Sequence, residues 1–373
     1  MRFIDIISDI ETIAALGTTR RAAIRRAVQQ RLFEYAASYD WPHYRSRGTL
    51  TTIDDYTTGT VAVTNGSKTV TGTSTVFTAA MGGRKFRVGS ENAWYDIDTR
   101  DSNTQLTLQQ DYQGTTASGS TYTIFQDEYK LEATVHKLLD IRQIEDSLVM
   151  LGLSYLDMDR WFPDPDTLND PTHFSLIGRR DDRYTTGTVA VTSGSRTITG
   201  TSTVWTSVPG LSRGSRLSID DTDEVFTVET IASDTSLTVY ELPTVTDSSS
   251  AYRIFTNNLL VQVWEVPDAT KNLYYRFQRL PYPLVNDEDE PDAPREYHYG
   301  LVWGGLVTGF ALLGKDTAAA EAERRWKQWV ALQISQLGQD SPAIQMERQS
   351  LDTYISKPWG PRLPANSAVA WWL

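Results

Sequence analysis

The sequence contains no cysteine, so neither disulfide bonds nor thiolate metal ligands can contribute to its stability. Its longest apolar run, residues 299–314, is shorter than the roughly 20 residues that a membrane-spanning helix needs. Basic residues are also scarce: 35 Lys and Arg stand against 47 Asp and Glu, giving a formal net charge of −12. This balance argues against a protein that binds nucleic acid by neutralising phosphates. The composition predicts a globular protein stabilised by burial alone.

Histidine is scarce too, and no residues are spaced like those of a catalytic or metal site. The four histidines are His43, His136, His173 and His298, with no paired-ligand spacing among them. Residues 309–315 have the spacing of a phosphate-binding loop, but Asp316 replaces its hydroxyl residue and the run has a helical pattern. Carboxylates cluster at 96–98 and 220–224, where we expect solvated turns between strands. We therefore predict no enzyme activity, no catalytic residue, no cofactor and no metal.

What the sequence does contain is a 23-residue segment that occurs twice. Residues 56–78 read YTTGTVAVTNGSKTVTGTSTVFT and residues 184–206 read YTTGTVAVTSGSRTITGTSTVWT, with four differences. Weaker matches follow in two further pairs of segments, 102–108 with 233–239 and 122–128 with 252–258. Each copy is therefore expected to be a domain of roughly 75 residues. Short β-branched runs between Asn-Gly or Ser-Gly turns indicate hairpins of a small sandwich or barrel.

The segments around the repeats predict further strands. Strands are expected at 47–53 and 174–177, directly before each repeat, and at 259–266 and 272–280, behind the second repeat. The two strands before the repeats would lack partners unless the chain returns to the same sheet afterwards. Both repeats are therefore predicted to be insertions into one discontinuous domain.

Helices are predicted near the two ends of the chain. Residues 18–39 have a helical apolar stripe that ends before Pro42. Residues 295–313 and 317–337 predict an antiparallel helical hairpin, and 343–354 a third helix. Gly305 and Gly309 lie four residues apart in the first of these helices, which would permit close helix packing.

These elements together predict an α+β fold. Its core would be discontinuous, a helical bundle with a small antiparallel sheet, interrupted by two duplicated all-β domains that are immunoglobulin-like or small barrels. The predicted boundaries are 1–53, 127–183 and 259–353 for the core, 54–126 and 184–258 for the inserted β-domains, and 354–373 for a C-terminal tail. Prolines keep this tail out of a helix, and it contains Trp359, Trp371 and Trp372. It either packs on its own subunit or acts as a docking arm, because tryptophan is a favoured interface anchor.

Four stretches, in this order, resemble a known family. They are YDWPHYRSRGTLTT at 39–52, the repeat GTVAVTNGSKTVTGTSTVFT, DEYKLEATVHKLLDIRQI at 127–144 and LVQVWEVPDATKNLYYRFQRLPYPL at 260–284. With the helical hairpin that follows, they resemble the head-to-tail adaptor (neck or tail tubular) proteins of short-tailed bacteriophages. The resemblance spans most of the chain.

The resemblance implies a structural virion protein, assembled in the host cytoplasm and located in the neck of the particle. Such adaptors form a homo-oligomeric ring, usually of about twelve copies, beneath the portal protein. The ring extends the DNA channel, through which double-stranded DNA passes without sequence-specific binding, and joins the capsid vertex to the tail. Further implied partners are the tail nozzle or tubular protein and tail fibres.

The family's C-terminal segment reaches into the portal, which by position implies a docking tail here. Its candidate portal-binding residues are Trp359, Arg362, Trp371, Trp372 and Leu373. The alternative is a receptor- or glycan-binding tail or fibre protein that uses its β-domains, and a glycoside hydrolase is a distant third. The position of the repeats favours the adaptor, because a fibre would carry its modules in tandem at one end.

Overall fold

The computed structural model describes residues 1–340, except residues 90, 92, 144–147, 164–167, 221 and 223. The chain divides into two compact units. One consists of Met1–Tyr39 and the residues from Ala293 onward, and the other of Asp40–Asp292. The described residues contain five α-helices and twenty-three β-strands, so the fold is mostly β.

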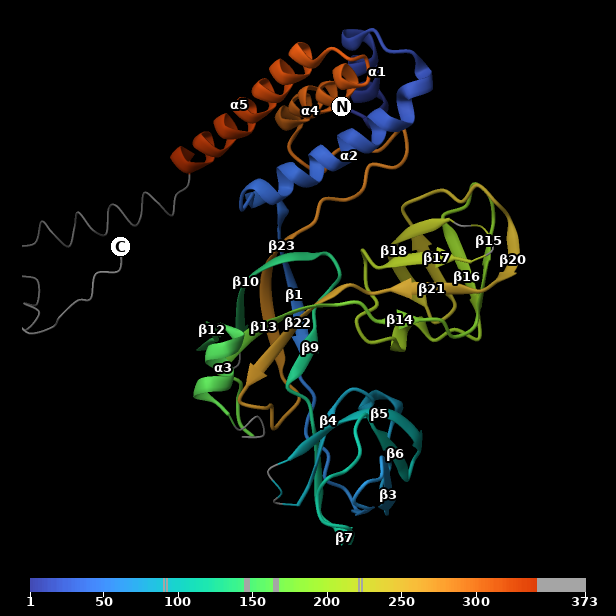
Figure 1. The fold of residues 1–373 in the computed structure, drawn as a ribbon, viewed down its shortest axis with the longest axis vertical. Helices are drawn as coiled ribbons and strands as arrows, with labels where there is room; N and C mark the ends of the chain where they lie inside the picture. The colour runs from blue at the N-terminus through green and yellow to red at the C-terminus, as the bar shows by residue number, and fades with distance from the viewer. Residues whose placement is uncertain are drawn as a thin grey trace, which may run out of the picture. The chain divides into compact units, whose positions relative to one another are not determined.

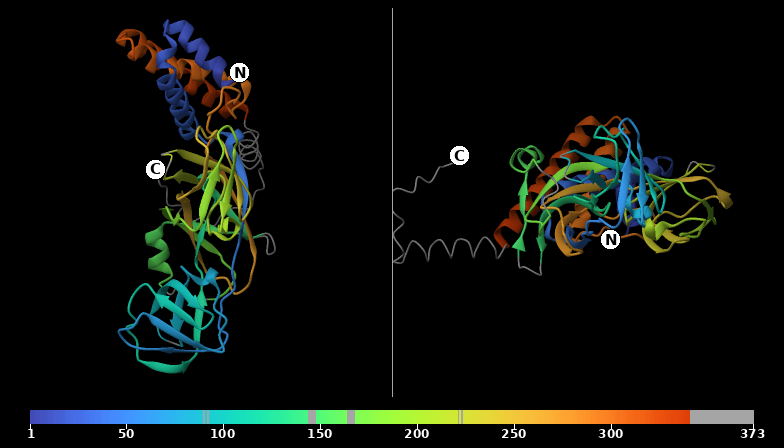
Figure 2. Two further views of the ribbon diagram at one scale, coloured as in Figure 1. Left: turned by 90° about the vertical axis from the view of Figure 1, so that its right-hand side faces the viewer. Right: turned by 90° about the horizontal axis from the view of Figure 1, so that it is seen from below.

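The first unit is helical (Figure 1). Its helices are α1 (Phe3–Ala14), α2 (Arg21–Ser38), α4 (His298–Ala311) and α5 (Asp316–Asp340), with 3-10 turns at Thr18–Arg20 and Arg295–Tyr297. α1 starts where the Arg2 backbone N–H donates to the Asp5 carboxylate at 3.0 Å, and it ends at Ala15, which is left-handed (φ 56°). α4 contacts α1, α2 and α5, and α5 lies beside α4 in Figure 1 and in the left view of Figure 2.

Glycines in α4 allow this close packing. A Cβ on Gly305 would lie 2.3 Å from Ile10 Cδ1, and one on Gly300 would lie 2.4 Å from the Trp329 ring. Any larger residue at either position would push the helices apart. The prediction that Gly305 and Gly309 permit close helix packing is thus confirmed. Residues 309–315 are the end of α4 and the turn after it, not a phosphate-binding loop.

The second unit is built on two four-stranded sheets. The first sheet has the order β1 (Arg45–Thr51), β23 (Asn272–Arg279), β10 (Val135–Gln143), β11 (Leu148–Val149), and the second the order β12 (Leu151–Leu153), β13 (His173–Arg180), β22 (Asn258–Trp264), β9 (Glu128–Lys130). The two sheets share one core, to which Leu273 and Phe277 contribute from the first sheet and Val261 and Val263 from the second. The short helix α3 (Tyr155–Trp161) lies between β12 and β13 in the chain.

Each repeat forms a sheet of its own, which we call the first and the second repeat module. The first module contains β2 (Thr60–Val63), β3 (Thr69–Thr73), β4 (Lys85–Val88), β5 (Trp94–Ser102), β6 (Gln105–Leu108), β7 (Ala117–Ser120) and β8 (Tyr122–Phe125). The second contains β14 (Arg183–Tyr184), β15 (Thr188–Val191), β16 (Thr197–Thr201), β17 (Arg216–Ile219), β18 (Val225–Ser233), β19 (Ser236–Val239), β20 (Asp247–Ser250) and β21 (Tyr252–Phe255).

The two modules repeat the same local structure. Val61 pairs with Gly72 in the first module, and Val189 pairs with Gly200 in the second. In each module a Cβ on that glycine would lie 2.2 Å from the hydroxyl oxygen of a buried threonine, Thr75 or Thr203. Packing therefore requires the glycine that the two 23-residue segments share at this position.

The predicted core of a helical bundle with a small sheet is wrong. The helices of the first unit bury residues such as Ile10, Val28 and Leu306, whereas the two four-stranded sheets have a core of their own. Helical periodicity identified α2, α4 and α5, but it did not identify α1 and could not tell which core the helices join. The predicted pairing of the strands around the repeats is confirmed, because β1 pairs with β23 and β13 pairs with β22. The domain boundaries stay a prediction, and the helix expected at 343–354 lies outside the described residues.

Candidate interaction surfaces

All five predicted portal-binding residues, Trp359, Arg362, Trp371, Trp372 and Leu373, lie outside the described residues. The docking tail therefore stays a prediction. Within the described residues, no three His, Asp or Glu side chains are grouped so that they could hold a metal ion. In the same part of the chain, no helix is both long and apolar enough to cross a membrane.

The acidic clusters and His298 have structural explanations. Asp96 and Asp98 are exposed positions of strand β5, alternating with buried Tyr95 and Ile97, so the expected turn at 96–98 is wrong. His298 is buried, and its Nε2 lies 2.8 Å from the Ala293 carbonyl oxygen. These residues give no support to a catalytic site.

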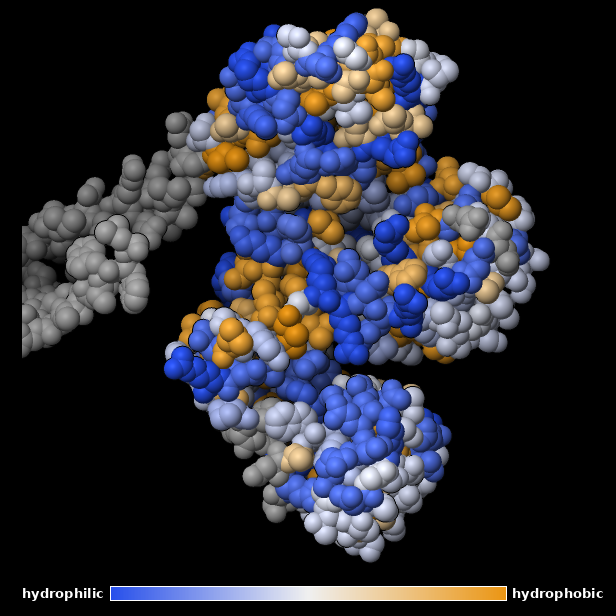
Figure 3. Space-filling view, in the orientation of Figure 1, coloured by the Kyte–Doolittle hydropathy of each residue, from blue (hydrophilic) through white to orange (hydrophobic). Residues whose placement is uncertain are grey.

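Exposed apolar side chains gather on one part of the second unit, which we call the α3 surface. It comprises Val149, Leu151, Tyr155, Leu156, Trp161, Leu168, Leu176 and Ile177. Figure 3 shows hydrophobic residues over β12, β13 and α3. Leu156 is 78% exposed and Trp161 59% exposed. Burying one such side chain contributes about 1.5–3 kcal/mol, so the α3 surface has the composition of an interface core.

The sequence positions these side chains through a capped helix at a sheet edge. The Ser154 hydroxyl accepts the Asp157 backbone N–H at 3.2 Å and donates to the Asp157 carboxylate at 2.6 Å, which starts α3. Met158 is buried beneath the helix and anchors it, while Leu156 is left outside. β12 is the last strand of its sheet, where backbone groups along one side have no strand neighbour.

A second surface, the exposed face of β1, β23 and β10, is basic. Arg47 lies opposite Arg276, and a cavity of about 360 Å³ is lined by Arg45, Arg47 and Arg276. Arg276 Nε donates to both carboxylate oxygens of Asp140 at 2.9 Å. This guanidinium holds the pKa of Asp140 below its usual value. In an acidic chain, such a face is complementary to an anionic partner surface.

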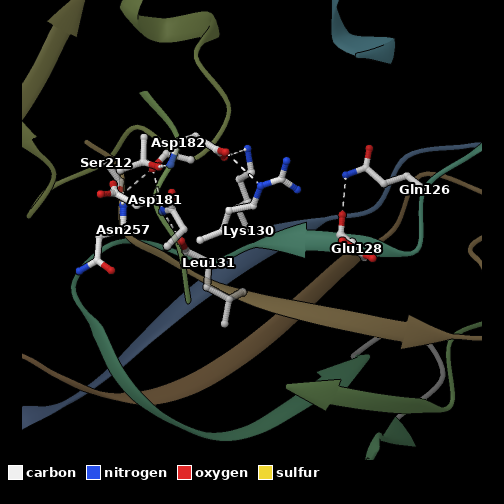
Figure 4. A network of polar contacts seen from close by, with 12 residues as sticks. Gln126, Glu128, Lys130, Leu131, Asp181, Asp182, Ser212 and Asn257 are labelled. Carbon is white, nitrogen blue, oxygen red and sulfur yellow. Dashed lines mark hydrogen bonds and ion pairs between the residues drawn. The ribbon is translucent and has the colours of Figure 1, made fainter. Parts of the chain in front are cut away.

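Polar contacts fasten the second repeat module to strand β9 (Figure 4). Lys130 forms an ion pair with Asp182, and the Ser212 hydroxyl accepts the Ala133 backbone N–H at 2.9 Å. The buried Asn258 amide donates to the Leu131 carbonyl oxygen at 2.6 Å and to the Gly210 carbonyl oxygen at 2.8 Å. We interpret this network as structural, because its groups bond to one another.

Residues 177–350 match the model of a family described as SU10 adaptor protein. The match runs from β13 through the second repeat module and the β22 and β23 strands into α5 and beyond. It supports an adaptor-type protein of a bacteriophage, and thus a structural role in the virion rather than an enzymatic one. None of the curated proteins matches the chain.

Sequence reasoning missed both the α3 surface and the basic face. The α3 surface is centred on the short helix α3. In its sequence YLDMDRW, apolar residues lie on all sides of the helix. This pattern is typical of a helix that is covered by protein on opposite sides, and it could have indicated the surface. The basic face gave no signal in the sequence, because its arginines come from segments more than 200 residues apart.

Proposed function

We propose that this protein is a head-to-tail adaptor that forms a ring beneath the portal of a bacteriophage. The ring joins the capsid vertex to the tail and extends the channel through which double-stranded DNA passes. About twelve copies form the ring. The C-terminal tail docks into the portal, and a tail nozzle or tubular protein binds the opposite side.

The α3 surface is the observation that carries this proposal. A monomer gains nothing from exposing Leu156 and Trp161, because each costs free energy in water that burial in an interface would recover. A ring needs two different complementary faces on each subunit. The family match to residues 177–350 supports an assembly subunit in which such faces are expected.

The test is to image the purified protein by negative-stain electron microscopy, alone and mixed with its portal protein, and to weigh the particles by mass photometry. We expect closed rings that stack on the portal. Leu156→Glu should disperse the rings into monomers, because it places a charge in the interface.

The matched control is Leu242→Glu, which makes the same change at a 43% exposed leucine of the second repeat module. It should leave the rings intact. A wild-type protein that stays monomeric both alone and with the portal would refute the proposal. Rings that persist in Leu156→Glu would show that the α3 surface is not part of the ring interface.

The second candidate, a receptor- or glycan-binding tail protein, is favoured by the surface that both modules share. β3 exposes Thr69, Thr71 and Thr73, and β16 exposes Thr197, Thr199 and Thr201. Each module also exposes one valine at the same place, Val76 or Val204. Binding of the full chain to host-cell glycans, lost in a Thr71→Lys, Thr199→Lys variant, would favour this candidate over the adaptor.

A further inference from the structure

A cavity of about 330 Å³ lies beneath α3. Its lining comes from α3 and the residues after it, from β22, and from β4 and β5 of the first repeat module. All of these belong to the second unit. The size is within the range of cavities that hold a small molecule or one long side chain.

Aromatic rings form much of the cavity lining. Phe162 and Trp264 are stacked, with ring centroids 3.7 Å apart and an interplanar angle of 16°. Trp94 and Tyr155 also line the cavity and are 41% and 46% exposed. Such rings attract cations, because the π-system is negative above the ring. The Lys85 ammonium already lies 5.8 Å from the centroid of the Trp94 ring.

The charged groups of the cavity are mostly acidic. Asp127, Glu128 and Asp159 line it, against a single cation, Lys85. The Lys85 ammonium donates to the buried Asp127 carboxylate at 2.6 Å and lies 3.7 Å from Glu128. Burial lowers the pKa of Lys85, but the charges of Asp127 and Glu128 outweigh this effect and raise it overall. Lys85 is therefore charged and engaged by Asp127, so Glu128 and Asp159 leave the cavity with an excess of negative charge.

Two further observations describe the polar groups of the lining. Burial raises the pKa of the Glu128 carboxyl, since Lys85 offsets only part of the desolvation. The Gln262 amide donates through Nε2 to Asp127 at 3.1 Å, which fixes its orientation. Its Oε1 is then a buried acceptor with no hydrogen-bond donor among the described residues. An unsatisfied buried acceptor is costly. This oxygen has almost no accessible surface, so it is not part of the proposed binding surface.

We propose that this cavity binds a guanidinium or ammonium group between its aromatic rings and its carboxylates. A guanidinium is planar, stacks on aromatic rings and offers five N–H donors, which suits a site that presents aromatic rings and carboxylates. An anion would meet the excess negative charge of Glu128 and Asp159. A neutral sugar could stack on Trp94 but would leave that charge uncompensated.

The same cation can come from an arginine side chain of a partner chain or from a free polyamine. The structure favours the side chain, because Tyr155 belongs both to the cavity and to the α3 surface. A chain seated on the α3 surface would bring its side chains to the cavity. Only this choice of source rests on the proposed ring; cation binding by the cavity does not.

The experiment titrates the full-length protein with arginine amide, spermidine and citrulline amide, using isothermal titration calorimetry. Citrulline amide replaces the guanidinium by an uncharged ureido group of nearly the same shape. We expect saturable binding of at least one cation and binding of citrulline amide that is weaker by roughly tenfold or more. Tighter binding of arginine amide assigns the site to a protein side chain, and tighter binding of spermidine assigns it to a polyamine.

Two variants locate the binding. Trp94→Ala should weaken it roughly threefold to tenfold, and Glu128→Gln by roughly tenfold. The matched controls are Tyr299→Ala and Glu288→Gln, which remove an exposed aromatic ring and an acid that line neither the cavity nor the α3 surface. Circular dichroism verifies that each variant is folded. Absence of saturable cation binding, equal binding of citrulline amide, or unchanged binding to both cavity variants would each overturn the proposal.

Discussion

The repeat modules and the α3 surface lie in one unit but differ in what they expose. The modules bury most of their apolar residues in cores of their own, and β3 and β16 present threonines to the solvent. Their exposed apolar side chains, such as Val76, Val204 and Leu242, are spread over both modules. Residues 149–177 instead expose eight large apolar side chains. The difference indicates that the modules are complete as monomers, whereas the α3 surface needs a partner. The repeats are the most conspicuous feature of the sequence, but the α3 surface is the feature that carries the proposed assembly.

The largest effect should come from removing residues 354–373. Portal association should be lost completely, because the docking tail is gone, while ring formation through the α3 surface continues. Mass photometry of the truncated protein, with and without portal, measures both. If the ring were lost together with portal binding, the tail rather than the α3 surface would hold the subunits together. This result would contradict the role proposed for the α3 surface.

A core substitution tests whether the second module is complete in itself. Trp205 is buried, and its indole N–H donates to the Tyr252 hydroxyl at 3.1 Å. Trp205→Ala should destabilise the module by about 3–5 kcal/mol, through a cavity and the loss of this hydrogen bond. Differential scanning calorimetry should show one transition moving to lower temperature, with rings intact.

Phe77→Ala, at the equivalent position of the first module, is the matched variant. It should shift a different transition. If either substitution dispersed the rings, the modules would be part of the assembly interface, contrary to the comparison.

Asp140 provides a smaller, pH-dependent effect on the basic face. Its pKa is below that of the unfolded chain because Arg276 binds the carboxylate, so it stabilises the fold above about pH 4. This stabilisation is lost as pH falls further, through the folded-state pKa. Asp140→Asn should therefore cost about 1 kcal/mol at pH 7 and less at pH 3. Urea unfolding at both pH values measures this, with Asp98→Asn, an exposed carboxylate of β5, as control.

The smallest effect is expected at the N-cap of α3. Ser154→Ala removes the acceptor for the Asp157 N–H and should destabilise α3 by about 0.5–1 kcal/mol. Ring dissociation on dilution should begin at a severalfold higher protein concentration, because Leu156 and Tyr155 lose their fixed positions. Ser154→Asp restores a capping acceptor and should restore the ring; a persistent defect would mean that Ser154 itself contacts the partner.

The fold was predictable where the local residue pattern of a segment agrees with its role in the tertiary structure. Alternating residues predicted strands at 259–266 and 272–280, and the structure has β22 at Asn258–Trp264 and β23 at Asn272–Arg279. The helix expected at 18–39 is α2 at Arg21–Ser38, preceded by a 3-10 turn. The membership of helices in a core was not predictable, because the partners of α4, such as Ile10, lie almost 300 residues away. We expected a turn at 96–98 because of the charges of Asp96 and Asp98. The alternation of apolar and acidic residues in WYDID, which is typical of a strand, was the better indicator.

Apart from the pattern of α3 itself, the α3 surface could not be predicted from the sequence, for a related reason. Leu151 and Leu176 lie in strands whose sequences are typical of buried strands, and only the tertiary fold shows that the described residues leave both side chains exposed. The cavity beneath α3 likewise combines Lys85, Asp127 and Trp264, which three separate strands or loops supply. Such sites depend on long-range pairing rather than on any local pattern.

The attachment points of the two modules give them different mechanical roles. The chain enters the first module after β1 and leaves it into β9, which belong to opposite sheets of the shared core. It enters the second module after β13 and leaves it into β22, which are neighbours in one sheet, with Arg180 paired to Asn258. A load on the first module is therefore divided between both sheets and acts across their common core. A load on the second module passes into a single sheet through two strands that move together.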